Sequence, residues 1–155
     1  LMKQHDRDGF LFYSNFDSRK GRELAAHPAA ALDFHWKSLK RQVRMAGGVA
    51  PVPGDVADAY FATRPRDSQL SAWASLQSES LPTRALFEAR LREADSRFPG
   101  DVPRPPFWGG WRLVPDWIEF WEERPGRQHH RERFDRLGPG GLDERDAWSF
   151  SLLYP

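Results

Sequence analysis

The last third of the chain contains four short runs with the residue pattern of β-strands: WGGWRLV, WIEFWEE, HRERFDR and AWSFSLL. In the fourth run, apolar residues recur at alternate positions, as they do in a strand with one buried face. Only short segments separate the runs, and the loop segment GPGGLDERD is rich in glycine. The pattern predicts antiparallel strands and constrains the fold more than any other feature of the chain.

The first third adds strands of the same kind. Leu1 to Lys3 and Phe10 to Ser14 flank the turn signal Asp8-Gly9, which predicts a β-hairpin. The runs AALDFHW and RQVRMAGGVAPV predict two more strands around a turn at Ser38-Leu39. Because the chain begins inside a strand, we expect an N-terminal portion of the domain to be missing from this sequence.

Four helices are expected between these strands. Ser18 is the expected N-cap of a helix that ends at Pro28, and Asp55 is the expected N-cap of the helix DVADAYFAT. RDSQLSAWASLQS predicts another short helix. In TRALFEARLREADSRF, one apolar stripe predicts the fourth helix; its members are Phe87, Leu91, Ala94 and Phe98.

The fold class that follows is α+β, a β-barrel or strongly bent antiparallel sheet with helices outside. The proline-rich segment FPGDVPRPPF connects elements that need each other as partners, so it is not a domain boundary. Residues 1–155 are therefore expected to form a single domain.

Composition narrows the possible functions. The 23 Lys and Arg residues nearly balance the 22 Asp and Glu residues, which argues against a general binder of nucleic acid. The absence of cysteine excludes disulfides, thiolate zinc sites and cysteine nucleophiles. No run has the length of a membrane span or the pattern of a signal peptide, so we expect a cytoplasmic protein without a membrane partner.

The stretch EFWEERPGRQHHRERF concentrates cationic residues. If it continues as a strand, the period of two places Arg127, His129 and Arg131 on one face, with Gln128 and His130 on the other. Such a row suits a phosphate, a carboxylate or an electron-rich ring. A charged, solvated edge strand is the alternative interpretation. A metal site is not expected, because the two histidines face opposite sides.

Three further groups are candidates for binding phosphate esters or rings. Ser18, Arg19 and Lys20 stand at a helix start, where free N–H groups and cations favour an anion. Gln42 has the donor and acceptor of an amide, which match the edge of a flavin or nucleobase. The third group recurs every four residues and meets if one helix continues past Pro65; it consists of Tyr60, Arg64 and Ser68.

Several enzyme classes lack support in this sequence. There is no GxGxxG, GxxxxGK[ST], GxSxG or HExxH pattern. Dinucleotide-fold, P-loop, serine-hydrolase and zincin mechanisms are therefore not indicated.

Taken together, the strings resemble the FMN-dependent pyridoxamine 5′-phosphate oxidase family. FYSNFDSRKGREL, LKRQVRMAG, AYFATRPRDSQLSAWASLQS, VPRPPFWGGWRL, IEFW and the Arg-x-His-x-Arg row follow the family's order. The resemblance extends from Leu1 to the final LLYP, although the family's N-terminal segment is absent. It also departs from the family at Gln128 and His130, where an apolar and an acidic residue are usual.

The resemblance implies a split β-barrel with flanking helices, which acts as a homodimer with two FMN sites at the subunit interface. The implied cofactor ligands are Leu1, Met2, Lys3, Tyr13, Ser14, Arg19, Lys20, Gln42, Gln77, Ser78, Trp121 and Arg131. The implied substrate ligands are Lys3, Tyr60, Arg64, Ser68, Arg127 and His129. Of these, Arg127 and His129 are the implied catalytic residues.

The implied activity is that of a flavin-dependent oxidase in vitamin B6 metabolism. Such an enzyme converts pyridoxine or pyridoxamine 5′-phosphate to pyridoxal 5′-phosphate with dioxygen and releases hydrogen peroxide, with ammonia from the amine. Three alternatives remain open at this point. They are an oxidase of another ring, such as a phenazine precursor, a non-catalytic module that binds FMN or pyridoxal phosphate, and a nucleic-acid binder.

Overall fold

The computed structural model describes residues 1–155, which group into two compact units. The helical unit comprises Leu1, Phe12–His27 and Pro51–Trp111. The sheet unit comprises Met2–Leu11, Pro28–Ala50 and Arg112–Pro155. Three strands run through both units, and the expectation of a single domain over residues 1–155 stays a prediction.

Seven strands form one sheet. Their bounds are Met2–Asp6 (β1), Gly9–Asn15 (β2), Ala29–Trp36 (β3), Arg41–Pro51 (β4), Trp108–Glu122 (β5), His130–Arg136 (β6) and Trp148–Leu152 (β7). The strand order is β1-β2-β5-β4-β3, and β6 pairs with both β5 and β7. The expected N-terminal hairpin and the two strands around Ser38-Leu39 are confirmed.

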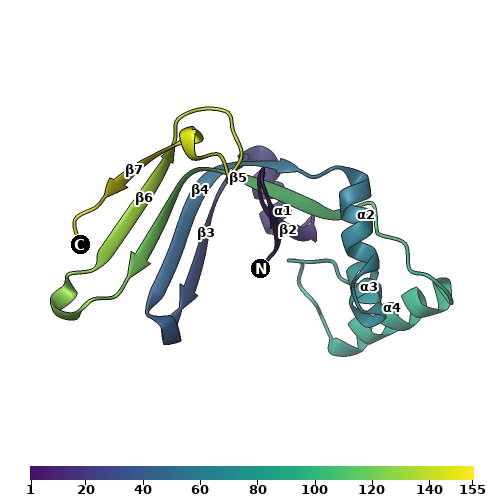
Figure 1. Cartoon of the computed structure of the whole chain (residues 1–155). Helices are drawn as coiled ribbons and strands as arrows, with labels where there is room; N and C mark the ends of the chain where they lie inside the picture. The colour runs from purple at the N-terminus through teal and green to yellow at the C-terminus, as the bar shows by residue number, and fades with distance from the viewer. The chain divides into compact units, whose positions relative to one another are not determined.

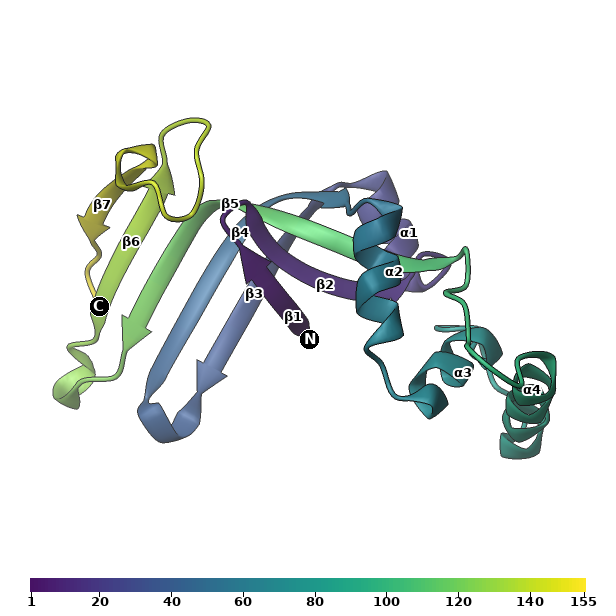
Figure 2. The same cartoon turned by 45° about the vertical axis from the view of Figure 1, so that its right-hand side comes forward.

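Within the sheet unit, neighbouring strands run antiparallel in a regular register (Figures 1 and 2). Leu32 lies opposite Met45 in the pair β3–β4, and Phe134 lies opposite both Ile118 and Phe150 in the pairs with β5 and β7. The most deeply buried side chains of this unit include Met45 and Leu113, which are 1% and 0% exposed. Burial of such side chains is the main driving force for sheet packing.

The prediction of two separate strands in WGGWRLV and WIEFWEE was wrong, because both belong to the 15-residue strand β5. Pro115 interrupts the pattern but lies fully buried within this strand. Gly47 on β4 permits the close approach at this point. A Cβ atom at Gly47 would lie 2.0 Å from the carbonyl oxygen of Val114 and 2.7 Å from the Cα of Pro115. A missing side chain on β4 thus lets β5 continue through its proline.

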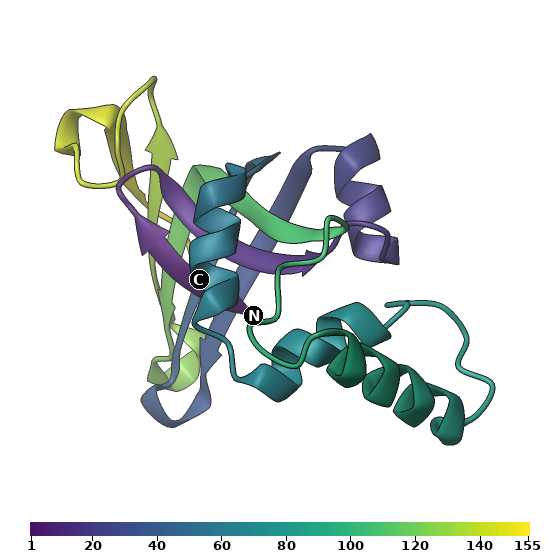
Figure 3. The ribbon, with the colours of Figure 1, turned by 90° about the vertical axis from the view of Figure 1, so that its right-hand side faces the viewer.

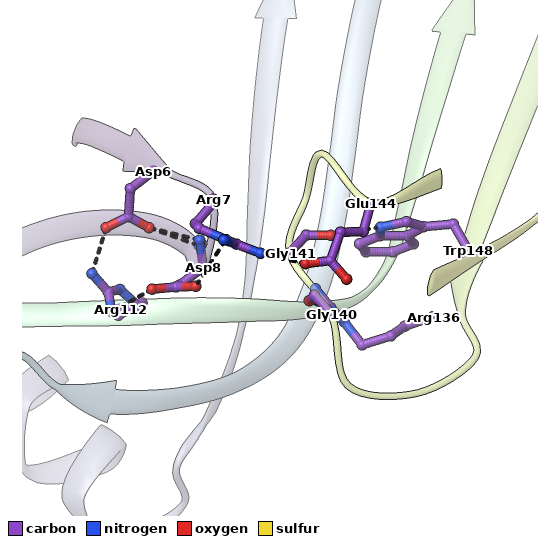
Figure 4. Close-up of polar contacts among 10 residues, drawn as sticks. Asp6, Arg7, Asp8, Arg112, Arg136, Gly140, Gly141, Glu144 and Trp148 are labelled. Atoms are coloured by element: carbon purple, nitrogen blue, oxygen red, sulfur yellow. Dashed lines mark hydrogen bonds and ion pairs between the residues drawn. The ribbon is translucent and has the colours of Figure 1, made fainter. Parts of the chain in front are cut away.

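The β1–β2 turn is fixed to the loop that precedes β7 (Figure 4). Asp6 accepts hydrogen bonds from the backbone N–H groups of Asp8 and Gly9 and pairs with Arg112 on β5. Across the turn, Arg7 pairs with Glu144, and its carbonyl accepts a 2.5 Å bond from the N–H of Leu142. The acidic loop GLDERD therefore helps to hold the hairpin that carries Met2 and Lys3.

Four helices belong to the helical unit. They are Arg19–Ala26 (α1), Gly54–Ala62 (α2), Arg66–Ala74 (α3) and Arg84–Arg97 (α4). Helices α3 and α4 lie next to one another (Figure 3). Leu91 and Ala94 of α4 and its C-cap Phe98 pack into a core with Phe61, Leu70 and Trp108. This confirms three members of the predicted apolar stripe; Phe87 does not belong to this core. The α+β fold class with antiparallel strands and flanking helices is confirmed. None of the helices is long and apolar enough to cross a membrane.

The helix starts were predicted with mixed success. Ser18 caps α1 as expected, since its side chain accepts from the N–H of Gly21. Asp55 is not the N-cap of α2; that position is Pro53, and Asp55 lies in the first helical turn. A carboxylate there still favours the helix through the macrodipole, which explains why the sequence pattern pointed to it.

The contact at Gly47 gives a test of the strand arrangement. Gly47→Ala should lower the free energy of unfolding by roughly 1–3 kcal/mol, because the added methyl group meets rigid backbone. Gly48→Ala is the matched control, since a Cβ atom there has no neighbour within 4 Å. Thermal unfolding followed by circular dichroism measures both. Equal melting temperatures for the two variants would contradict the close approach of β4 to Pro115.

Candidate functional site

The start of α1 brings together two segments that are far apart in the sequence. The N–H of Arg19 donates to Oγ of Ser78 at 3.1 Å, and the N–H of Asn15 donates to Oε1 of Gln77 at 3.2 Å. Ser18 Oγ accepts from Gly21 and donates to the carbonyl of Asn15 at 2.7 Å. The Gln77-Ser78 pair thus lies at the helix N-terminus that the sequence assigned to an anion.

The charges at this helix start are suited to an anion. Arg19 is exposed and bonds Glu23 at 2.8 Å; this bond and the charge of Glu23 raise the pKa of Arg19. The ammonium of Lys20 lies 5.6 Å from the ring centroid of Phe12 and has no carboxylate partner. A helix N-terminus with an uncompensated cation is a favourable place for a phosphate group.

A second cationic group lies in an aromatic environment of the same unit. The guanidinium of Arg64 lies 4.8 Å from the ring centroid of Trp108 and 5.4 Å from that of Phe61. Its Nη1 is buried without a hydrogen-bond partner. Burial lowers the pKa of Arg64, and the nearby Tyr60 opposes this shift only in part. An unpartnered buried donor on a cation is costly alone, so the site favours an anionic ligand.

Tyr60, Arg64 and Ser68 do not share one helix, so the condition under which their spacing would bring them together is not met, and the two predicted helices are separate. Helix α2 ends at Ala62, and Pro65, in an extended conformation, precedes α3. Proline disfavours a helical conformation at the preceding residue and offers no N–H, which accounts for the break. Ser68 is half-buried in the first turn of α3.

The sheet unit contains a buried charge network. Glu119 on β5 is only 2% exposed and accepts from Nε of Arg131 and Nη2 of Arg44, both at 2.8 Å. Arg131 also donates to the carbonyl of Tyr154 at 2.8 Å. Burial alone would raise the pKa of Glu119, but hydrogen bonds and positive charge from Arg131 and Arg44 outweigh it and lower the pKa. The same contact raises the pKa of Arg131.

The predicted strand face of Arg127, His129 and Arg131 was wrong. The strand β6 begins only at His130, and Pro125–Arg127 form a tight turn. Gly126 and Arg127 have φ values of 64° and 59°, a left-handed conformation that no strand adopts. The opposite-face assignment of Gln128 fails for the same reason, so spacing along a strand does not separate the roles of Arg127 and Arg131.

His129 nevertheless lies close to another expected ligand. Its ring centroid is 4.6 Å from that of Trp121, and its Nδ1 accepts from the N–H of Arg124. Trp121 on β5 lies directly opposite Arg131 on β6. Three residues of the candidate site are therefore neighbours at this end of the sheet unit.

The remaining candidates have simpler surroundings. Gln42 on β4 donates to Asp33 at 3.0 Å, while Met2 and Lys3 lie on β1 and Leu1 is fully exposed. Ser14 is buried, and its Oγ lacks a hydrogen-bond partner. Sequence reasoning missed the role of Glu119, although its place in the IEFW string between two arginine-bearing strands was a usable signal.

Comparison with known proteins places these features in a family. A family model described as pyridoxamine 5′-phosphate oxidase matches residues 1–98. A second, described as the pyridoxine 5′-phosphate oxidase C-terminal dimerisation region, matches residues 108–155. Fold and matches define an FMN-dependent oxidoreductase, as expected, and the second match supports the expected homodimer. The chain belongs to the pyridoxamine 5′-phosphate oxidase family.

Curated relatives agree over the whole length of the chain. A pyridoxine/pyridoxamine 5′-phosphate oxidase of Sphingopyxis alaskensis is 58% identical over 100% of this chain and 69% of its own length. The protein of the same name from Anaeromyxobacter dehalogenans is 52% identical, with 75% of its own length covered.

Two solved structures share the fold. PhzG from Burkholderia lata, determined in complex with tetrahydrophenazine-1-carboxylic acid, has a TM-score of 0.88 and 28% identity. The match covers 99% of this chain and 72% of PhzG. A pyridoxamine 5′-phosphate oxidase-related, FMN-binding protein from Nostoc punctiforme has a TM-score of 0.74. The match covers 100% of this chain and 78% of that protein, and at 17% identity it supports the fold alone.

The buried network predicts a pH-dependent contribution to stability. Glu119→Gln should lower the free energy of unfolding at pH 7 by about 1–3 kcal/mol, because two arginines lose a charged acceptor. Since the folded-state pKa is lowered, this contribution is complete above about pH 4.3 and disappears as the pH falls through the folded value. The unfolding curves of wild type and variant should therefore converge in acid.

Glu123→Gln is the control for this experiment, because Glu123 forms an exposed 3.5 Å pair with Lys40. Denaturant unfolding at a series of pH values measures all three proteins. A Glu119→Gln deficit that is the same at pH 7 and pH 3.5 would show that the network does not act through the charge of Glu119.

Proposed function

We propose that this protein oxidises pyridoxine 5′-phosphate and pyridoxamine 5′-phosphate to pyridoxal 5′-phosphate, with dioxygen as the final acceptor. The alcohol and dioxygen give the aldehyde and hydrogen peroxide. The amine, dioxygen and water give the aldehyde, ammonia and hydrogen peroxide. The proposal rests mainly on one observation: the helical unit has two separate cationic sites suited to a phosphate group, one at the start of α1 and one at Arg64.

The first place fits the phosphate of FMN. Arg19, Lys20 and Ser78 are at the helix start, and the buried Ser14 has an oxygen without a partner. Bound FMN supplies the hydride acceptor that no amino-acid side chain provides. In the sheet unit, Gln42, Trp121 and Arg131 are proposed to contact the cofactor, with Met2 and Lys3 on β1 and Leu1 before it. Glu119 holds Arg131 in one orientation, which favours a preformed contact.

The second place fits the phosphate of the substrate. Arg64 has a buried donor without a partner, and Tyr60 and Ser68 offer hydroxyl groups on either side of it in the sequence. The family resemblance also assigns Lys3, which belongs to the sheet unit, to the substrate. We assign the binding and orientation of the substrate to these four residues, because holding a reactant in place lowers the barrier without any chemical step by the side chain.

Arg127 and His129 are proposed to orient and polarise the reacting alcohol or amine. His129 lies against Trp121, a proposed cofactor contact, while Arg127 is exposed in the turn before β6. This placement supports different roles for the two residues. Gln128 and His130 stand where the family usually has an apolar and an acidic residue, but Arg127 and His129 are retained.

Oxidation of a phenazine-type ring is the second candidate function. The likeness to PhzG, which binds tetrahydrophenazine-1-carboxylic acid, favours it. Arg64 favours a phosphorylated substrate, and turnover of each compound by the same preparation decides between them. Binding without turnover would favour a non-catalytic module. A cytoplasmic location also remains a prediction.

The substrate assignment is tested with Arg64. The FMN-loaded protein should consume one dioxygen for each pyridoxal 5′-phosphate that it forms from pyridoxine 5′-phosphate. Arg64→Ala should retain FMN and raise KM by about 10- to 100-fold, the loss expected for one charge-assisted phosphate contact. Arg92→Ala, an exposed cation on α4, is the control. An unchanged KM in Arg64→Ala would remove this residue from the substrate site.

The cofactor assignment is tested at α1. Combined Arg19→Ala and Lys20→Ala should weaken FMN binding, with each lost phosphate contact costing on the order of 1.5–3 kcal/mol. Quenching of flavin fluorescence on binding measures the affinity. Unweakened FMN binding in the double variant would exclude the start of α1 as the phosphate site.

A further inference from the structure

The WGGW motif at the start of β5 makes room for aromatic rings. A Cβ atom at Gly110 would lie 2.7 Å from Cε1 of Tyr13, and one at Gly109 would lie 2.3 Å from Cζ of Phe16. Each glycine is thus covered by a ring from β2 or the residue after it. Since real Cβ atoms do not approach so closely, any side chain at position 110 must displace both Tyr13 and Val52, whose Cγ2 would lie 2.6 Å away.

The ring of Tyr13 belongs to a three-membered stack. Its centroid lies 3.9 Å from that of Tyr60, with 14° between the planes, and 5.4 Å from that of Trp108, with 9°. Tyr60 and Trp108 are 6.3 Å apart and within 5° of parallel. Trp108 in turn lies under the guanidinium of Arg64. Parallel rings at these distances attract one another and restrict one another's orientation.

The stack joins the two proposed phosphate places. Tyr13 is two residues before Asn15, which bonds Gln77 and Ser18 at the start of α1. At the other side of the stack, Tyr60 and Trp108 lie next to Arg64. All of these residues belong to the helical unit. A ligand that orders one end therefore restricts rings that contact the other end.

We infer that the Tyr13–Tyr60–Trp108 stack couples the two sites, so that FMN at α1 and a phosphorylated pyridine at Arg64 each tighten the binding of the other. This inference rests on the function proposed above. When either ligand binds and orders the stack, the protein loses conformational entropy. The second ligand then binds to a stack that is already ordered, so its binding costs less entropy. Linkage requires the effect to be reciprocal. Gly110 and Trp108 are positioning residues in this scheme.

Simple core packing is the competing explanation, because Trp108 is buried and both tyrosines pack against its cluster. A packing role predicts that variants lose stability but keep the coupling between the ligands. Direct contact between the two ligands also contributes to coupling. This direct contribution does not involve Gly110, because Tyr13 and Val52 fill the space that a side chain at position 110 would occupy.

The experiment measures the FMN dissociation constant of the full chain with and without saturating pyridoxal 5′-phosphate. In wild type the ratio of the two constants should be about 5 or more, the lower end of typical coupling. Gly110→Ala, which displaces Tyr13, should reduce the ratio several-fold. Gly109→Ala is the matched control, because it creates a similar clash with Phe16 in the same strand and should keep the wild-type ratio.

Should Gly110→Ala fail to fold, Tyr13→Leu and Tyr13→Phe replace it. The first removes the ring and should reduce the ratio; the second keeps the ring and should preserve it. An unchanged ratio in both Gly110→Ala and Tyr13→Leu overturns the coupling. Equilibrium dialysis measures the binding of pyridoxal 5′-phosphate separately. A wild-type ratio of 1 with this ligand bound also overturns the coupling, whereas no binding of the ligand refutes the proposed function.

Discussion

The continuity of β5 is the constraint on which the candidate site depends. Its first residue, Trp108, belongs to the aromatic stack of the helical unit, and its later residues Glu119 and Trp121 belong to the charged end of the sheet unit. One strand can carry both only because β4 and β2 approach it where a side chain is missing, at Gly47 and Gly110. These two glycines thus determine where the candidate site residues of β5 lie.

The arginines act locally, as the nearly neutral composition implied. Arg131 and Arg44 share the buried Glu119, and Arg112 pairs with Asp6. A paired guanidinium keeps a fixed orientation but has less attraction left for a ligand. Arg64 differs from these three arginines, since it lies against rings and has no carboxylate partner. Its full charge therefore remains available to a bound anion.

Local signals predicted most elements, while the errors arose where tertiary contacts decide. The Ser18 cap and the apolar stripe of α4 depend on neighbours in sequence, so their patterns were sufficient. The continuation of β5 through Pro115 depends on Gly47, nearly 70 residues earlier, and no local sequence pattern indicates this contact. Similarly, the left-handed backbone conformation of Arg127 rules out the strand face that the Arg-x-His-x-Arg pattern predicted. The meeting of Ser78 with α1 followed from the family resemblance and not from spacing.

The fit of rings onto glycines has a consequence for how such sequences can diverge. At positions 13 and 110, and again at 16 and 109, one member of the pair occupies the volume that the other lacks. Neither partner can change freely while the other stays. We expect these positions to vary as pairs among relatives, with a larger residue on β5 accompanied by a smaller one on the segment that covers it. The aromatic stack would then be inherited or lost as a unit.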